Sequence, residues 1–327
     1  MKQCPFSHSG KRDSVTRREF LHGAAMTAAG LAVAGCAPNA PESSSAQGSS
    51  SPAEKGKPVV AIAKADSYDP KLVKKQVQKM LDGIGGVSDV LAHGNRVAIK
   101  VNLTGGTNTK PFPGTSEVET YLTHPTVVQA LIELLRDAGA KDIFIVEAAY
   151  QKESWPAYGY TDVAKATGAT IVDLSYADPY KDFTKVPPGT DPMVYESFVF
   201  NPILTEIDAF VSVSKMKCHN VAGVTHTMKN LFGNVPCRYY TLSPQDDWSW
   251  RSEFHGKASE TGERVPKIIV DLNRARPVNL ALIDGIMTAE AGEGPWISAF
   301  TPVQPGVMFA GKDPVATDAI ATVAMGF

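Results

Sequence analysis

The chain has 327 residues, a formal net charge of −2 and 43% hydrophobic residues. This charge, with no long basic stretch interleaved with aromatic residues, excludes a typical nucleic-acid-binding protein. After Cys36 only Cys218 and Cys237 remain, so we expect neither a disulfide scaffold nor an iron–sulfur cluster within the chain. An expected helix between these two cysteines would also hold them too far apart for a bridge.

Residues 1–36 have the arrangement of an export signal, since basic residues precede an Ala- and Gly-rich run that is too short to span a bilayer. The segment Thr-Arg-Arg-Glu-Phe-Leu at 16–21 resembles a twin-arginine signal, and Val-Ala-Gly-Cys at 33–36 resembles a lipobox. Together they predict export by the twin-arginine machinery and attachment to the periplasmic or extracytoplasmic face of a membrane through a lipid on Cys36. An ordinary signal peptide with Cys36 near its cleavage site is the alternative.

Residues 37–57 are rich in Ser, Pro, Ala and Gly, which predicts a flexible linker before a single α/β domain at 58–327. In this domain, apolar runs alternate with segments of helical period. The alternation favours a mostly parallel sheet with helices on both faces and long loops at one edge. Strands are predicted at 59–63, 96–103, 142–146, 170–174, 209–214, 278–283 and 306–310, and helices at 71–81, 125–138, 160–167, 221–232 and 265–274.

Three stretches escape this regularity, at 104–123, 176–193 and 234–262. Loops of this length in a compact domain are often functional. The third carries Trp248, Trp250, Arg251 and His255, which could fold over a pocket, although tryptophans in a loop can equally serve as its packing anchors. The chain stops just after a further helix opens near residue 313, which indicates that the sequence continues beyond Phe327.

Polar side chains follow several of the predicted strands. In a parallel sheet the strand ends meet at one edge, where ligands bind. The side chains expected there are Lys100, Asn102, Glu147, Lys217, His219 and Asp284. Each taken alone also has an ordinary explanation as a helix cap or a solvated turn.

The predicted helix at 221–232 would place His226, Lys229, Asn230 and Gly233 on one stripe. Imidazoles on this stripe could ligate a metal, or could hold a carboxylate or phosphate together with lysines. The first turn of the helix would offer backbone N–H groups to an anion. Further along, Glu293 lies in an acidic, glycine-rich loop at 289–295 that could ligate a hard cation or form a lid.

These motifs resemble the family catalogued as domain of unknown function 362. The resemblance is carried by 123–141, by Lys-Met-Lys-Cys-His at 215–219, by Met-Lys-Asn-Leu-Phe-Gly at 228–233, by Asp-Gly-Ile at 284–286, by 292–295 and by 311–316. It implies one α/β unit and shared positions at Lys217, His219, Lys229, Asn230 and Asp284, but no established activity. Some relatives carry a fused ferredoxin-like iron–sulfur module, of which this chain shows no sign.

The leading hypothesis is therefore an exported enzyme that binds a small anionic substrate and performs redox or isomerase chemistry with a metal or other cofactor. Its predicted catalytic residues are Lys217, His219 and Lys229. Its predicted substrate-binding residues are Lys100, Asn102 and Asn230, and its predicted metal ligands are His219, His226, Asp284 and Glu293. The alternatives are a surface lipoprotein that binds an anion or metal without turnover, and a cofactor-assembly partner with an interface at Trp248 and Trp250.

Overall fold

The computed structural model describes residues 56–242, 250–257 and 259–327. The predicted signal, nearly all of the predicted linker and Trp248 lie outside these residues, so the predicted division of the chain stays a prediction. Pro58–Ala321 form one compact unit. Within the described part of the chain, no helix combines the length and the apolar character that a membrane span requires.

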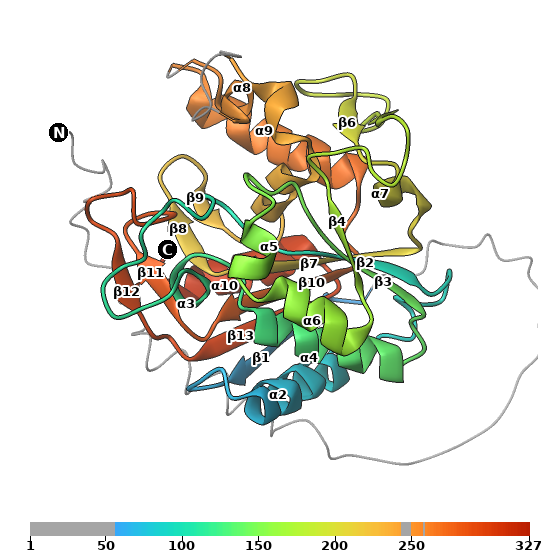
Figure 1. Cartoon of the computed structure of the whole chain (residues 1–327), viewed down its shortest axis with the longest axis vertical. Coiled ribbons are helices and arrows are strands. Elements are labelled where there is room, and N and C mark those ends of the chain that lie inside the picture. The colour runs from blue at the N-terminus through green and yellow to red at the C-terminus, as the bar shows by residue number, and fades with distance from the viewer. Residues whose placement is uncertain (1–55, 243–249, 258) are drawn as a thin grey trace, which may run out of the picture. The chain divides into compact units, whose positions relative to one another are not determined.

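The centre of this unit is a seven-stranded sheet (Figure 1), as the pattern of apolar runs predicts. The strand order is β1-β13-β10-β7-β2-β3-β4. The five strands from β10 to β4 are parallel, and β13 runs antiparallel to both of its neighbours. The bounds are β1 Val60–Lys64, β2 Arg96–Lys100, β3 Asp142–Glu147, β4 Thr170–Asp173, β7 Ala209–Lys215, β10 Leu280–Gly285 and β13 Val307–Gly311.

Helices cover both faces of the sheet, which confirms the predicted fold class. One face packs against α2 (Pro70–Gly83), α4 (Pro125–Asp137) and α6 (Tyr160–Thr167), and the other against α7 (Ile203–Glu206) and α9 (Thr261–Ala275). Side chains alternate between the faces, so Val97 and Ile99 of β2 join the first core while Ala98 joins the second. Because Lys100 has the parity of Ala98, it lies on the α9 side.

The chain from 221 to 232 is not the predicted helix. It contains β9 (Gly223–Thr225), which pairs with the preceding strand β8 (Lys217–His219) in a short hairpin. A 3₁₀ helix, η1 (Lys229–Asn234), follows. Gly223 has φ 78°, outside the helical region, and the valines and threonines that flank it favour extended backbone. The predicted stripe and the predicted anion site at a helix N-terminus are therefore wrong.

Short elements occupy the three irregular stretches and the remaining connections. The first stretch contains α3 (Glu117–Thr120), the second β5 (Thr184–Val186), and the third η2 (Cys237–Tyr240) and α8 (Ser252–His255). The other connections contain α5 (Ser154–Ala157), β6 (Phe198–Phe200) and the hairpin of β11 (Thr288–Glu290) with β12 (Thr301–Val303). Helix α10 (Pro314–Ala324) follows β13. Neither Cys218 nor Cys237 forms a disulfide.

Candidate functional site

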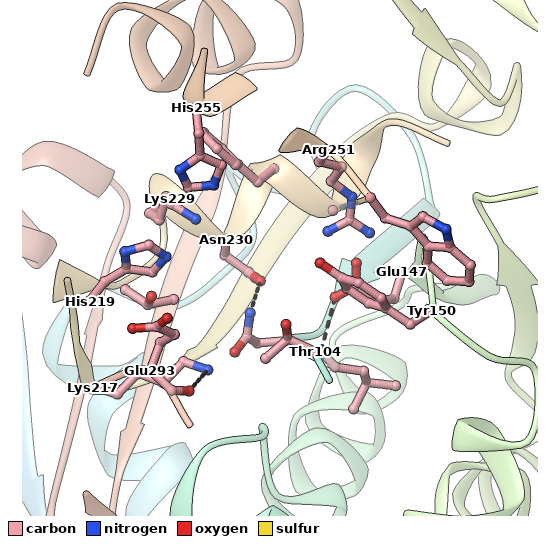
Figure 2. Close-up of a pocket in the computed structure, with 16 residues that line it drawn as sticks. Thr104, Glu147, Tyr150, Lys217, His219, Lys229, Asn230, Arg251, His255 and Glu293 are labelled. Carbon is pink, nitrogen blue, oxygen red and sulfur yellow. Dashed lines mark hydrogen bonds between the residues drawn. The ribbon is translucent and has the colours of Figure 1, made fainter. Parts of the chain in front are cut away.

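A cavity lies beyond the carboxyl ends of β2 and β3, between η1, α8, β8 and the loop after β11 (Figure 2). It encloses about 560 Å³ of empty space, including open solvent at its mouth. Seven of the side chains predicted from the strand ends, the stripe and the acidic loop line it: Asn102, Glu147, Lys217, His219, Lys229, Asn230 and Glu293. The structure thus brings together groups from five separate segments of the chain.

Lys217 enters the cavity from β8 with only 1% of its surface exposed. Its Nζ donates hydrogen bonds to the backbone oxygens of Tyr121 at 2.7 Å and Glu293 at 3.1 Å. Burial lowers the pKa of Lys217 to about 7, and the charge of Lys229 acts in the same direction, while Glu293 opposes it. Lys217 is therefore poised between ammonium and amine near neutral pH.

Lys229 opens η1 and faces the same cavity. Its Nζ lies 3.9 Å from the centre of the Phe232 ring. Burial lowers the pKa of Lys229 to about 7, with the nearby charge of Arg251 contributing. A cation over an aromatic face is stabilised by the ring quadrupole, so this contact favours the charged form of Lys229.

His219 presents one ring nitrogen to the chain and the other to the cavity. Its Nδ1 accepts hydrogen bonds from the backbone N–H groups of Val221 at 3.2 Å and Ala222 at 3.3 Å. Burial, with the charges of Lys229 and Lys217, lowers the pKa of His219 far below its usual value, so the ring is neutral. With Nδ1 acting as an acceptor, the proton resides on Nε2, which is a hydrogen-bond donor.

Lys100 does not line the cavity, contrary to its predicted role in substrate binding. It is fully buried behind the wall, where Nζ contacts Glu147 Oε2 at 2.9 Å and Asn230 Oδ1 at 3.1 Å. Burial lowers the pKa of Lys100 to about 8 and raises the pKa of Glu147. Lys100 thus holds Glu147, which lines the cavity, from behind.

Asn230, which touches Lys100, and Asn102 form the adjacent part of the cavity wall. Asn230 Oδ1 also accepts a hydrogen bond from Asn102 Nδ2 at 3.2 Å, and Asn230 Nδ2 donates to Ser212 Oγ at 3.1 Å. Both functional atoms of the Asn230 amide are therefore occupied within the protein. Of the two predicted asparagines, only Asn102 has an uncommitted atom, its Oδ1.

Asp284 is held away from the cavity by Lys215. Its Oδ2 lies 2.7 Å from Lys215 Nζ, its Oδ1 accepts from Tyr68 at 2.9 Å, and both members of the ion pair are fully buried. The backbone N–H groups of His124 and Ile286 complete its shell at 3.1 and 3.2 Å. This network has the character of a structural ion pair that joins loops on the α2 side of the sheet.

The predicted metal ligands are not assembled. Asp284 and His226 do not line the cavity, and the Nδ1 of His219 is occupied by backbone donors. Glu293 accepts from Asn220 N–H and Trp296 Nε1–H. Within the described ranges, no group of three or more His, Cys, Asp or Glu side chains could hold a metal ion. The prediction of a metal centre made from these four side chains is thus wrong.

The stretch after η1 supplies the remaining wall of the cavity. Of the two interpretations of 234–262, a cover over a pocket and a loop packed by its own tryptophans, this arrangement matches the first. Trp250, Arg251 and His255 all line the cavity. Trp250 stacks on Tyr150, with ring centres 5.1 Å apart, and the ring of His255 lies 6.1 Å from that of His219 and nearly parallel to it. The sequence signal for this wall was the cluster of aromatic and basic residues in a long loop. Tyr150 carried no such signal.

The cavity and its immediate wall carry an excess of positive charge. Lys100, Lys217, Lys229 and Arg251 supply four basic groups against two acidic ones, Glu147 and Glu293. An enclosed site with this balance and several hydrogen-bond donors is suited to a small anion. The fold and site define an α/β protein with a cationic cavity at the carboxyl edge of its sheet.

Comparison with known proteins assigns this architecture to a family. The chain belongs to the family described as Domain of unknown function (DUF362), which matches residues 97–323. It is 26% identical over 264 residues to the thylakoid-associated protein sll1697 of Synechocystis sp. (strain ATCC 27184 / PCC 6803 / Kazusa), covering 80% of this chain and 73% of that protein. The structure of the lactate racemase apoprotein from Thermoanaerobacterium thermosaccharolyticum aligns with a TM-score of 0.45 and 14% identity, covering 80% of this chain and 56% of that one. The chain thus spans little more than half of that structure.

Proposed function

We propose that this protein is an enzyme that binds a small organic carboxylate and moves a proton at the carbon next to it, as an isomerase does. The observation that carries the proposal is the pair of lysines, Lys217 and Lys229, that line one cavity with pKa values lowered to about 7. Lysines transfer protons and not electrons, so the pair favours isomerase over redox chemistry among the two expectations.

Near pH 7 each of the two lysines is about half protonated, and their surroundings differ in which form they stabilise. Lys217 donates to two carbonyl oxygens, which match the two N–H groups of a neutral amine and leave its lone pair for the cavity. Lys229 sits over the Phe232 ring, which favours the ammonium. We therefore assign the base to Lys217 and the charged anchor for the carboxylate to Lys229.

In this reaction Lys217 accepts the proton as the C–H bond breaks, and the electron pair of that bond moves toward the carboxylate to form an enediolate. The ammonium of Lys229 and the Nε2–H of His219 stabilise the charge that develops on the oxygens. The ammonium of Lys217 then returns a proton from the same side, either to the same carbon or to a conjugated position. Atoms and electrons balance without a further reactant.

The test uses purified protein in D₂O with a panel of small carboxylates, and follows exchange of the carbon-bound proton by NMR. Lys217→Met should lose exchange while retaining most of the affinity for the carboxylate, and Lys229→Met should lose affinity. Lys79→Met, at an exposed position of α2, is the matched control and should behave as the parent. Absence of exchange with every compound, or full exchange in Lys217→Met, would refute the assignment.

The second candidate is anion binding without turnover, which the charge balance of four basic groups to two acidic ones supports equally well. Under this alternative a carboxylate or phosphate binds stoichiometrically, Lys229→Met weakens it, and no carbon-bound proton exchanges. The interface proposed for an assembly partner has less support, since Trp250 is half-buried against Tyr150 in the cavity wall.

We also propose that the protein is exported and lipid-anchored, on the strength of its first 36 residues. Metabolic labelling with a fatty acid, followed by fractionation, tests the anchor in cells that express the full chain. Cys36→Ala should remove the label and release the protein from membranes, and replacing Arg17 and Arg18 by lysine should leave it in the cytoplasm. Labelling of Cys36→Ala at the parental level would refute the anchor.

A further inference from the structure

We propose that the carboxylate ligand also carries a hydroxyl group, which is held on the wall formed by Arg251, Glu147 and Asn102. This inference rests on the proposed function and specifies its substrate class. Figure 2 shows the two sides of the cavity, with Lys217, His219 and Lys229 on one side and Arg251, Glu147 and Tyr150 on the other. A ligand that spans the cavity therefore meets two chemically different walls.

Three polar atoms on the second wall have no hydrogen-bond partner among the described residues: Asn102 Oδ1, Glu147 Oε1 and Arg251 Nε. The three residues line the cavity and are only 9%, 2% and 8% exposed. Buried polar atoms in folded proteins nearly always have a hydrogen-bond partner, since a buried polar atom without one costs free energy. Three of them around one cavity indicate a group that the bound ligand supplies.

The neighbours of these atoms hold them in place. Glu147 Oε2 is engaged by Lys100 Nζ at 2.9 Å and by the N–H of Leu103 at 3.0 Å, which leaves Oε1 as the uncommitted acceptor. Arg251 Nη2 donates to the backbone oxygen of Ala148 and, at 2.8 Å, to Cys237 Sγ. These bonds orient the guanidinium and leave Nε without a partner among the described residues. The wall is thus preorganised before a ligand arrives.

Gly233 keeps space beside the uncommitted carboxylate oxygen. A Cβ at this position would lie 1.8 Å from Glu147 Oε1 and 2.6 Å from Lys100 Nζ. Any other residue would fill the space where this oxygen sits, so the glycine preserves the position of Glu147.

The kind of unpaired atom selects the ligand group. Because the wall offers one donor and two acceptors, the ligand group must both accept and donate: a hydroxyl accepts from Arg251 Nε and donates to either Glu147 Oε1 or Asn102 Oδ1. An ammonium has no acceptor for Arg251 Nε, and a second carboxylate has no donor for Glu147 or Asn102. A trapped water, which has two O–H donors, would pair with all three atoms, and the experiment below separates water from a ligand hydroxyl.

The experiment measures the affinities of acetate, glycolate and glycine for the purified full chain by calorimetry at a pH below 7, where the lysines are charged. Acetate and glycolate differ by one hydroxyl, and glycine replaces it by an ammonium. We expect glycolate to bind at least about tenfold more tightly than acetate, and glycine no more tightly than acetate. Equal affinities for acetate and glycolate would overturn the inference and leave the proposed function standing, since water would then occupy the wall.

Two variants locate the effect. Arg251→Lys keeps the charge and removes the Nε donor, so the preference for glycolate should shrink to within about twofold. Lys229→Met should weaken acetate and glycolate by the same factor and preserve their ratio. A preference that survives Arg251→Lys would place the hydroxyl elsewhere and overturn the assignment. Failure of the parent protein to bind either acid would instead refute the proposed carboxylate function itself.

Discussion

The Nζ of Lys229 lies 3.9 Å from the centre of the Phe232 ring, three residues further along the same 3₁₀ helix. Lys217, which faces the same cavity, donates to two backbone carbonyls, and its own aromatic neighbour, Tyr121, is more distant, with the ring centre 5.7 Å from Nζ. Two lysines with similar pKa values therefore sit in different surroundings. This difference is the basis for assigning charge to one and basicity to the other.

The first prediction concerns pH. A bound carboxylate favours the protonated lysines, whose pKa values are lowered to about 7, so binding should be strongest below pH 7 and should weaken as the pH rises through 7. The loss should reach at most about tenfold per pH unit for each proton taken up on binding. Calorimetry in buffers of different ionisation enthalpy measures both quantities. Affinity that is flat between pH 6 and 9 would contradict the lowered pKa values.

Catalysis should follow a different profile from binding. The base form of Lys217 is present above about pH 7 and the charged form of Lys229 below it, so kcat/KM for proton exchange should be bell-shaped around neutrality. Lys217→Met should remove the activity at every pH. A profile that rises steadily to pH 10 would show that no charged lysine is needed.

Two substitutions of His219 separate its contribution to stability from its contribution to catalysis. In His219→Asn, the side-chain oxygen can replace Nδ1 as acceptor for the N–H groups of Val221 and Ala222, while the Nε2–H is lost. We expect this variant to fold with a stability close to that of the parent and to exchange protons at least about tenfold more slowly. His219→Ala removes both the acceptor and the Nε2–H donor, so it should lose the exchange activity and also about 0.5–1.5 kcal/mol in the free energy of unfolding. Denaturant unfolding and the exchange assay provide the two readouts, and unchanged exchange in His219→Asn would exclude a catalytic role.

Asp284 should be important for folding and not for ligand binding. Asp284→Asn breaks its ion pair with Lys215 and leaves a buried charge uncompensated, which should cost about 3–5 kcal/mol in the free energy of unfolding. The control Asp162→Asn, at a side chain that is 85% exposed, should be nearly neutral. Carboxylate affinity of folded Asp284→Asn should stay within about twofold of the parent. A much larger loss of affinity would connect this network to the site.

Gly233→Ala should damage the site from within the wall. The added Cβ would collide with Glu147 and Lys100, so we expect a loss of about 1–3 kcal/mol in the free energy of unfolding and weaker carboxylate binding. Gly262→Ala is the matched control, because it lies in α9 and its added Cβ would have no atom within 4 Å. It should be neutral or slightly stabilising, since alanine favours helix. Equal stability of the two variants would show that Glu147 moves aside without cost.

Much of the fold was predictable because burial leaves a periodic trace in the sequence. The seven strands of the sheet and the helices α2, α4, α6 and α9 coincide with predicted segments to within a few residues. The segment 221–232 failed because its apolar spacing suits a helix equally well as a hairpin. There Gly223 and the β-branched neighbours, rather than the spacing, fixed the local conformation.

The convergence of Lys217, His219 and Lys229 on one cavity was predictable from the rule that strands of a parallel sheet end at one edge. The position of Asp284 outside the cavity was not predictable from this rule. The sequence places Lys215 and Lys217 two residues apart in one motif, yet Lys215 ends in the buried network with Asp284 and Lys217 in the cavity. This separation depends on β7 ending at Lys215 and β8 beginning at Lys217, which the motif alone does not reveal.

The sequence by itself determined the α/β class, the edge at which polar groups collect and most of the cationic residues of the cavity, because these follow from hydrophobic period and chain order. The tertiary structure decided which of those groups are paired internally and which face the cavity. The pairing of Lys100 with Glu147 and of Lys215 with Asp284 joins residues distant in sequence, and it is set by packing in three dimensions. Burial and neighbouring charge then lower the pKa values of Lys217 and Lys229, and neither quantity exists until the chain has folded.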